Sequence, residues 1–346
     1  MSDILDRCLQ DLESRLDDGE EQRNFEAWQG FINGECREEF FVPPQRTPSP
    51  PRVEWPEVNV NAAIADYDLM LLSQFRTCSD VLASGGSGRL AVRCNYGTGI
   101  LPSLFGCAIF MMEDATNTLP SAVPLGSRGR IRQLIREGVP RIRGGLGEKV
   151  FVAAERFLQA FARHPRIARW VSLYHPDAQG PIDIAEVVWG SDIFYAFYDD
   201  RQLLRDFLGL VTETYGAFMR AWYELVPQKH DWSDHWNLMH KGVLMIRNDS
   251  LMNLSPKVYA DLIRPHDQKL FDEFGGGAVH FCGRGCHFIE AMSQVRGLWA
   301  INMSQPELND MEMIYRNTVD RGIKLVGFSR AAAESAGRPL RGQVQV

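Results

Sequence analysis

The chain has 346 residues, 45% of them hydrophobic and 10% aromatic, so it can bury a large core and has the composition of a globular enzyme. Its net charge of −7 and pI near 5.7 argue against a general affinity for nucleic acid or for an anionic membrane. No signal-peptide pattern and no apolar run of about 18 residues is present, which predicts a soluble, cytoplasmic protein. The seven cysteines follow no disulfide spacing, and in a reducing compartment they are free for metal binding or catalysis.

The first 60 residues differ in character from the rest. Residues 1–35 are acidic and carry apolar residues at helical spacing, which predicts a peripheral amphipathic helix. Residues 42–56 contain six prolines, which exclude a helix and favour an extended arm. This arm is either a simple linker or a segment that lies across a neighbouring surface or an active-site entrance, as Phe40, Phe41 and Trp55 favour. We therefore divide the chain into a helix and proline-rich arm over 1–60 and a main domain over 61–346.

Helical patterns and short apolar runs alternate along the main domain. Helices are expected at 61–82, 146–163, 200–225, 255–274, 286–294 and 307–319, and strands at 90–94, 170–174, 243–246, 278–282, 298–302 and 324–327. Short buried strands that alternate with long helices indicate a parallel α/β sheet. Periodicity alone does not distinguish an eight-fold barrel from an open doubly wound sheet.

Polar side chains follow five of the expected strands. They are Arg93, Asn95 and Tyr96; Tyr174, His175 and Asp177; Asp249 and Ser250; His280 and Cys282; and Asn302, Ser304 and Gln305. In a parallel barrel the carboxyl ends of all strands open at one face, where α/β enzymes hold their active sites. Any single residue of this set could instead cap a helix or bond loop backbone.

The stretch Gly277-Ala-Val-His-Phe-Cys-Gly-Arg-Gly-Cys-His287 is the most informative in the chain. Residues i and i+2 of a strand point to the same side, so His280 and Cys282 share one face. As metal ligands they suit Zn²⁺, with Cys286 or His287 close enough in the chain to supply a third ligand. As a metal-free pair, Cys282 is a candidate reactive thiol beside an imidazole. A purely structural role, as small buried groups, is the third interpretation.

Two arginines are candidates for binding an anionic substrate. Arg93 follows the first strand of the main domain, and a guanidinium can hold a carboxylate or phosphate through two hydrogen bonds. Arg284 lies in the glycine-rich turn at an expected helix start and could add to that site, or it could form a surface ion pair.

Over residues 90–330 the chain resembles the uroporphyrinogen decarboxylase superfamily. The resemblance rests on several short motifs that occur in the family's order. These are Gln179-Gly-Pro-Ile-Asp-Ile-Ala-Glu186 with Trp189-Gly190, Tyr198-Asp-Asp200, Asp249-Ser250, Leu254-Ser-Pro-Lys-Val-Tyr259 with Pro265, and His280-Phe-Cys-Gly283.

The resemblance implies a (β/α)₈ TIM barrel with an N-terminal helical and proline-rich extension, and an active site at the strand ends. The chain departs from the decarboxylase branch: it has no N-terminal R-Q-A-G-R-Y-like segment, no tyrosine around Glu186–Val188 and no late G-H-G motif. It is similar to the methyltransferase branch, whose zinc-binding H-x-C corresponds to His280 and Cys282. That branch has a third cysteine ligand near the last strand, and no cysteine follows Cys286 here.

We therefore expect a zinc-dependent enzyme that transfers a methyl group to or from a thiol or a corrinoid-linked acceptor. Asp249, His175 and His280 are the expected catalytic residues, and His280, Cys282 and Cys286 the expected metal ligands. The expected substrate-binding residues are Arg93, Tyr96, Asp177, Gln179, Ser250, Arg284 and Asn302. The alternatives are a metal-free decarboxylase or lyase acting on a small carboxylate, and a non-catalytic small-molecule-binding barrel. A small-molecule substrate, a corrinoid protein and a second copy in a homodimer are the expected partners, and neither nucleic acid nor membrane is expected.

Overall fold

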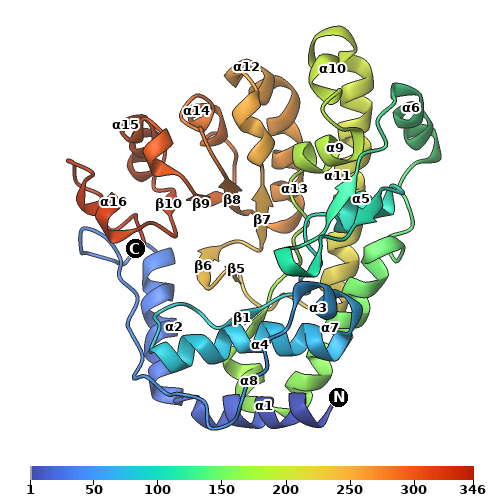
Figure 1. Ribbon diagram of the computed structural model, residues 1–346. Coiled ribbons are helices and arrows are strands. Elements are labelled where there is room, and N and C mark those ends of the chain that lie inside the picture. Colours follow the sequence, from blue (N-terminus) through green and yellow to red (C-terminus); the bar gives the residue numbers. More distant parts are fainter. Residues whose placement is uncertain (1) are drawn as a thin grey trace.

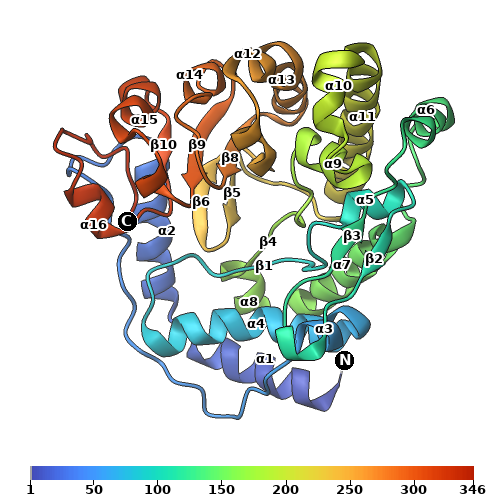
Figure 2. The ribbon, with the colours of Figure 1, turned by 45° about the horizontal axis from the view of Figure 1, so that its top comes forward.

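The structure is a computed structural model that describes residues 2–346. The parallel strands lie at the centre and helices surround them, as Figures 1 and 2 show. Strands β7 (Leu244–Arg247), β8 (Gly277–Phe281), β9 (Leu298–Met303) and β10 (Lys324–Leu325) form one parallel sheet in the order β10-β9-β8-β7. Strands β1 (Ala91–Val92) and β4 (Ser172–Leu173) form a second parallel pair. The predicted α/β class with parallel strands is confirmed, whereas the described strands do not join into one closed eight-stranded sheet.

The long helices agree with the sequence pattern in position. Residues 200–225 form α11 (Arg201–Leu225), which Asp200 caps by accepting a hydrogen bond from the Leu203 amide. The outer helices of the main domain are α3 (Val60–Ala65), α4 (Tyr67–Ser84), α5 (Ile100–Leu104), α6 (Arg128–Glu137), α7 (Gly145–Arg163), α8 (Pro165–Trp170), α9 (Pro181–Trp189), α10 (Ile193–Asp199), α14 (Ile289–Met292), α15 (Met311–Asn317) and α16 (Arg330–Glu334). The single helix expected at 61–82 is broken at Asp66, whose side chain accepts from the Leu69 amide and starts α4.

Pro265 disturbs the expected helix at 255–274. Ser255 caps its start by accepting from the Val258 amide, and Pro256 occupies the first turn, as predicted. The chain then runs through α12 (Pro256–Val258), a π-helical turn over Tyr259–Ile263 and α13 (Arg264–Phe274). Proline has no amide hydrogen for the regular ladder, so a wider turn precedes it.

Two antiparallel hairpins were not predicted: β2 (Ala108–Phe110) with β3 (Ser121–Val123), and β5 (Trp232–His235) with β6 (Leu238–Lys241). The β5–β6 turn consists of Trp236 and Asn237, both with positive φ. This hairpin links the two parallel sheets: the Arg89 amide before β1 donates to the Asn237 carbonyl, and Met239 packs with inner residues of the four-stranded sheet. It lacks the glycine that normally marks such a turn in a sequence.

The four-stranded sheet has two different faces. Ile246, Val279 and Ile301 belong to the main core, which also receives α1 (Asp3–Arg15). The opposite face packs in a second core with the β5–β6 hairpin and α2 (Asp18–Ile32). The members of this second core are Trp28, Phe31, Phe41, Met239, Met245, Ala278, Ala300 and Val326. We call this the inner face of the sheet.

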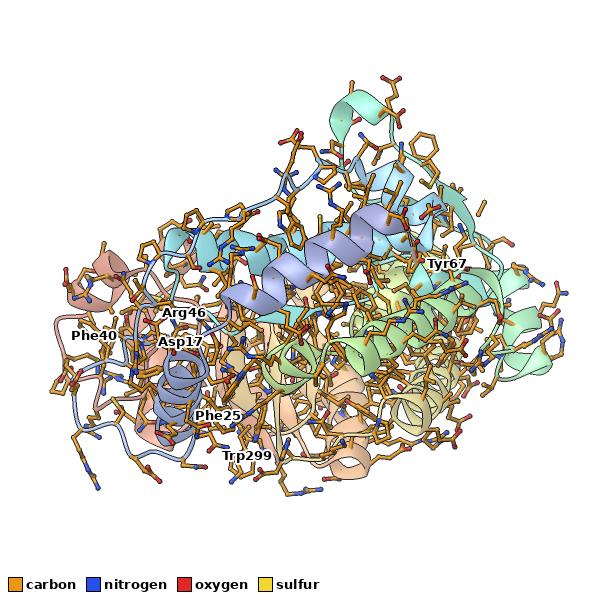
Figure 3. All side chains as sticks on the ribbon, turned by 90° about the horizontal axis from the view of Figure 1, so that it is seen from below. Asp17, Phe25, Phe40, Arg46, Tyr67 and Trp299 are labelled. Carbon is orange, nitrogen blue, oxygen red and sulfur yellow. The ribbon has the colours of Figure 1, made fainter. Side chains whose placement is uncertain are left out.

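The proline arm lies against protein, as predicted, but along the outside of the molecule between α2 and α1 rather than over the strand ends (Figures 1 and 2). Arg46 forms a buried ion pair with Glu21, at 2.6 Å from Nε to Oε1, and donates to the Gly88 carbonyl at 2.9 Å. Trp55 is 9% exposed, and its Nε1 donates to Asp11 Oδ2 at 3.1 Å. Figure 3 shows Arg46 near Asp17, at the junction of α1 and α2.

Candidate metal centre

The ends of three adjacent strands bring polar side chains to one level of the sheet. Arg247 on β7 pairs in register with His280 on β8, and His280 pairs with Asn302 on β9. Each lies two residues beyond a member of the second core, at Met245, Ala278 and Ala300. Because side chains alternate along a strand, all three continue the inner face beyond the packed core.

Asp249, His280 and Cys282 converge so closely that their ligand atoms all lie within 4.8 Å of one another. His280 Nε2 is 3.3 Å from Cys282 Sγ and 3.6 Å from Asp249 Oδ1. Asp249 Oδ1 also accepts a hydrogen bond from the Cys282 amide at 2.7 Å, which fixes the carboxylate against the strand end. The Asp249 side chain is 42% exposed, so the group faces solvent on one side. We call Asp249, His280, Cys282 and Asn302 the strand-end cluster.

Asn302 sets the tautomer of His280. The Asn302 Nδ2 donates to the Val326 carbonyl at 2.7 Å, so its Oδ1 must face the imidazole. That oxygen lies 2.7 Å from His280 Nδ1, which therefore carries the proton. The lone pair of Nε2 then points toward Cys282 and Asp249, the tautomer that metal-bound histidines use. Gly327 makes room for this amide, since a Cβ there would come 2.4 Å from Asn302 Nδ2.

The Cys282 thiol is not activated by its protein surroundings alone. Burial raises its pKa, the nearby Asp249 charge adds to that effect, and only the Ser304 hydroxyl opposes it. Burial lowers the pKa of His280, although Asp249 acts in the other direction. Without a cation, the pair is therefore a neutral thiol beside a neutral imidazole.

Helix α9 holds the loop that carries Asp249. The Asp183 carboxylate accepts from the backbone amides of Asp249 at 2.8 Å and Ser250 at 2.9 Å, and the Ser250 hydroxyl donates to Glu186. Gly180 allows α9 to start this close, because a Cβ there would lie 2.1 Å from Asn248 Oδ1. Burial, together with the Asp249 charge, raises the pKa of Asp183 to about 8.

An arginine cluster lies beside the strand-end cluster. Asp177 is shared by two guanidinium groups: Arg93 Nη1 is 3.4 Å from its Oδ2, and Arg247 Nη1 is 3.1 Å from its Oδ1. Gln179 Nε2 donates to the same Oδ1 at 2.6 Å. Burial alone would raise the pKa of Asp177, but Arg247 and Arg93 hold it below the ordinary value. We call Arg93, Asp177, Gln179 and Arg247 the arginine cluster.

Trp236, at the tip of the β5–β6 hairpin, connects the two clusters. The Arg247 guanidinium lies 4.7 Å from the centre of its ring, and the His280 ring lies 5.0 Å away in an edge-to-face arrangement. The tryptophan ring thus contacts both Arg247 and the candidate metal ligand His280.

His175 lies in a separate, closed group. Its Nδ1 donates to the Pro176 carbonyl at 2.8 Å, and its Nε2 accepts from the Met245 amide at 3.0 Å. Its ring packs on His235, whose Nδ1 is 2.8 Å from His240 Nε2. Burial lowers the pKa of His175 to about 3 and that of His240 to about 4. We call His175, His235 and His240 the histidine cluster. Both nitrogens of His175 are occupied by backbone groups.

The remaining predicted residues lie apart from the three converging ligand atoms. Cys286 is not among them: its amide donates to Asn309 Oδ1, and its side chain packs against the main core. His287 Nε2 binds the Leu254 carbonyl at 3.0 Å. Arg284 is exposed. Tyr96 is fully buried, and its hydroxyl has no partner among residues 2–346.

Sequence reasoning missed Arg247, Asp183 and Trp236. Arg247 could have been found, because the alternation that places His280 and Cys282 on one face also places Met245, Arg247 and Asp249 on one face. Asp183 stands out in the sequence only as a member of the motif over 179–186, since nothing in the sequence places α9 beside the β7 loop. Trp236 depends on a hairpin without a turn signal.

No family model matches the chain, and no curated protein matches it. Among solved structures, it is similar to a methyltransferase from Methanosarcina mazei, with a TM-score of 0.60 and 16% sequence identity over 91% of this chain and 90% of that one. Within the described residues, no helix is long and apolar enough to cross a membrane. At this level of identity the two proteins share a fold, and that fold extends over nearly the whole of both chains.

Proposed function

We propose that this protein is a zinc-dependent methyltransferase of the uroporphyrinogen decarboxylase-like type, built on a (β/α)₈ barrel, that acts on a thiol. The observation that carries the proposal is the convergence of Asp249, His280 and Cys282 at the ends of β7 and β8. The fold shared with a methyltransferase supports the choice of reaction class.

The donor set suits zinc. An imidazole nitrogen, a thiol sulfur and a carboxylate oxygen are the ligand types that Zn²⁺ takes, and three protein ligands leave a fourth position open for substrate. His280 Nε2 lies 3.3 Å from Cys282 Sγ and 3.6 Å from Asp249 Oδ1, and all three ligand atoms lie within 4.8 Å of one another, close enough for one ion to contact all of them. When bound, zinc would act as a Lewis acid that lowers the pKa of a thiol acceptor.

The protein groups around this position have separate tasks. Asn302 holds His280 in the tautomer that leaves Nε2 free. Asp183 fixes the loop from which Asp249 projects. Methyl transfer from a corrinoid donor to a thiol would break the cobalt–carbon bond, leave its electron pair on the corrinoid, form a sulfur–carbon bond and release the thiol proton. The half-exposed Asp249 is placed to pass that proton to solvent. Because both nitrogens of His175 bind backbone, we assign it to joining β4 to β7 rather than to proton transfer.

Metal analysis and turnover test the proposal together. We expect about one zinc per chain by elemental analysis, and methyl transfer from methylcobalamin, used as a donor probe, to a small thiol. His280→Ala and Cys282→Ser should lose both zinc and turnover. Cys286→Ser is the matched control, since it removes a thiol from the same motif but not from the converging group, and it should keep both.

Wild-type protein that retains no zinc after exposure to excess metal would overturn the zinc assignment. Release of carbon dioxide from a small carboxylate by such metal-free protein would favour the lyase alternative. Full zinc occupancy without methyl transfer from any corrinoid or thioether donor would support the zinc site but refute the methyltransferase assignment. The proposal includes a corrinoid protein as partner and a homodimer as the oligomeric state. Gel filtration of the purified protein tests the homodimer.

A further inference from the structure

Arg247 is buried with three of its five N–H donors unused. It is 1% exposed, and among residues 2–346 its Nε and Nη2 have no partner. Only Nη1 is engaged, by Asp177 at 3.1 Å and, at 3.5 Å, by the Met245 carbonyl. Leaving a charged donor unpaired inside a protein is costly, so such a group usually has a partner that the protein chain does not supply.

The unused atoms form one edge of the guanidinium. The hydrogens of Nε and of Nη2 project side by side in the plane of the group, and two parallel N–H bonds match the two oxygens of a carboxylate. The Arg247 guanidinium carbon lies over the Trp236 ring, 4.7 Å from its centre, and this contact uses none of the N–H donors of Nε and Nη2. A carboxylate in the plane of the guanidinium can accept from both.

The surrounding charges leave room for one negative charge. Arg93 and Arg247 share the single carboxylate of Asp177, so this group carries a net charge of +1. Both Asp177 oxygens are already occupied, one by Arg93 and the other by Arg247 and Gln179. The three neighbouring histidines do not add charge near neutral pH, because burial lowers their pKa values.

We propose that the Nε–Nη2 edge of Arg247, assisted by Arg93, binds the carboxylate of a small-molecule ligand. Arg247 and His280 occupy paired positions on adjacent strands and the same face of the sheet, so a carboxylate bound there lies next to the candidate metal centre. That this carboxylate belongs to the thiol acceptor rests on the proposed function. The substrate class would then be a short thiol that also carries a carboxylate.

Binding of simple anions tests the site without reference to catalysis. Propionate should bind saturably, with a roughly millimolar dissociation constant for so small a probe, in calorimetry at constant ionic strength. Arg247→Lys keeps the charge and removes the two-bond edge, and it should weaken propionate binding on the order of 10- to 100-fold. Arg316→Met, an exposed arginine on α15, is the control and should bind propionate as wild type does. Phosphate and sulfate, which carry more negative charge than the single net positive charge of the arginine cluster balances, should bind more weakly than propionate.

Propionate binding at the arginine cluster should not depend on zinc at the candidate metal centre. Propionate binding should persist in His280→Ala, which keeps the arginine cluster while losing the candidate centre. Absence of saturable binding in wild type, or equal binding in Arg247→Lys, overturns the carboxylate site whatever the zinc content. Phosphate bound more tightly than propionate overturns the carboxylate assignment in favour of a phosphate ligand.

A competition between acceptors then tests the substrate class. With methylcobalamin as donor, kcat/KM for 3-mercaptopropionate should exceed that for 2-mercaptoethanol by about tenfold or more in wild type, and Arg247→Lys should abolish that preference. Equal use of the two thiols by wild type would refute the link between the anion site and the substrate, even if propionate binds.

Discussion

The strand-end cluster and the histidine cluster both contain histidines and lie on neighbouring strands, yet their roles differ: the first is a candidate ligand site, and the second is structural. In the histidine cluster, His175 gives one nitrogen to a backbone carbonyl and the other to a backbone amide, and His240 bonds the Lys241 carbonyl and His235. In the strand-end cluster, one nitrogen of His280 is fixed by Asn302, and the other points at a thiol and a carboxylate. The destination of the second ring nitrogen, rather than the residue type, separates a structural histidine from a candidate ligand.

The histidine cluster is also more deeply buried than the strand-end cluster, which agrees with its structural role. His175, His235 and His240 are at most 2% exposed, whereas the Asp249 side chain is 42% exposed. The histidine cluster therefore joins β4, β7 and the β5–β6 hairpin, and the strand-end cluster is open to a ligand. His235 departs from this division: its Nε2 is buried and has no partner in the described part of the chain.

The largest expected effect comes from the strand-end cluster. His280→Ala should reduce zinc affinity by more than the roughly 10- to 100-fold that loss of an outer hydrogen-bond partner costs, because it removes a ligand directly. The free energy of unfolding of the metal-free protein should change by only about 1 kcal/mol, since the residue continues the inner face beyond the packed core. Competitive titration with a chelator and urea unfolding measure the two quantities. Unchanged zinc affinity would remove the distinction between the clusters.

The reverse result is expected for the histidine cluster. His240→Ala leaves the Lys241 carbonyl and the His235 N–H without a partner in a buried site and opens a cavity, so it should cost about 2 to 4 kcal/mol of unfolding free energy. Zinc content of the protein that remains folded should not change. Urea denaturation with elemental analysis of the same sample checks both statements, and loss of zinc without loss of stability would contradict them.

A smaller effect is expected at Asn302, which touches the site only through His280. Asn302→Ala removes the acceptor for Nδ1–H and frees the imidazole to change tautomer, so zinc affinity should fall roughly 10- to 100-fold. Ser304→Ala is the comparison: its hydroxyl lies 3.4 Å from Cys282 Sγ and does not affect the tautomer. Ser304→Ala should bind zinc more tightly than Asn302→Ala. The opposite order would mean that the His280 tautomer is not set by Asn302.

Only some residues of the two clusters, and only some of the elements that carry them, could be predicted from the sequence. Alternation along β8 was enough to put His280 and Cys282 on one face, and the positions of α11, β7 and β9 followed from apolar patterns. Three-dimensional facts decided the rest. Asp249 rather than Cys286 approaches the H-x-C pair, because the Asp249 loop is tied down by Asp183 while the Cys286 amide is bound by Asn309. His175 looks like a catalytic residue in a sequence, since the backbone groups that occupy its nitrogens lie 1 and 70 residues away.

The smallest effect concerns pH and belongs to the histidine cluster alone. Burial lowers the pKa of His240 to about 4, below the ordinary value of 6.5, so the unfolded chain binds a proton that the folded chain refuses. The stability that His240 contributes is thus present above pH 6.5 and is lost as the pH falls toward 4. Between pH 7 and pH 5 this loss amounts to about 1 to 2 kcal/mol for one such histidine.

His240→Gln tests this sign, because it keeps polar groups in place and removes the titrating one. Asp183 and Asp267, whose pKa values burial raises to about 8 and about 7, act in the opposite direction, since protonation favours their folded forms as the pH falls. Both carboxylates are present in wild type and variant, so their effect cancels in the difference. Urea unfolding at pH 7 and pH 5 should show that the variant loses less stability than wild type on acidification. Equal losses would mean that His240 is charged in the folded protein, and the histidine cluster would then not be the closed, neutral counterpart of the strand-end cluster.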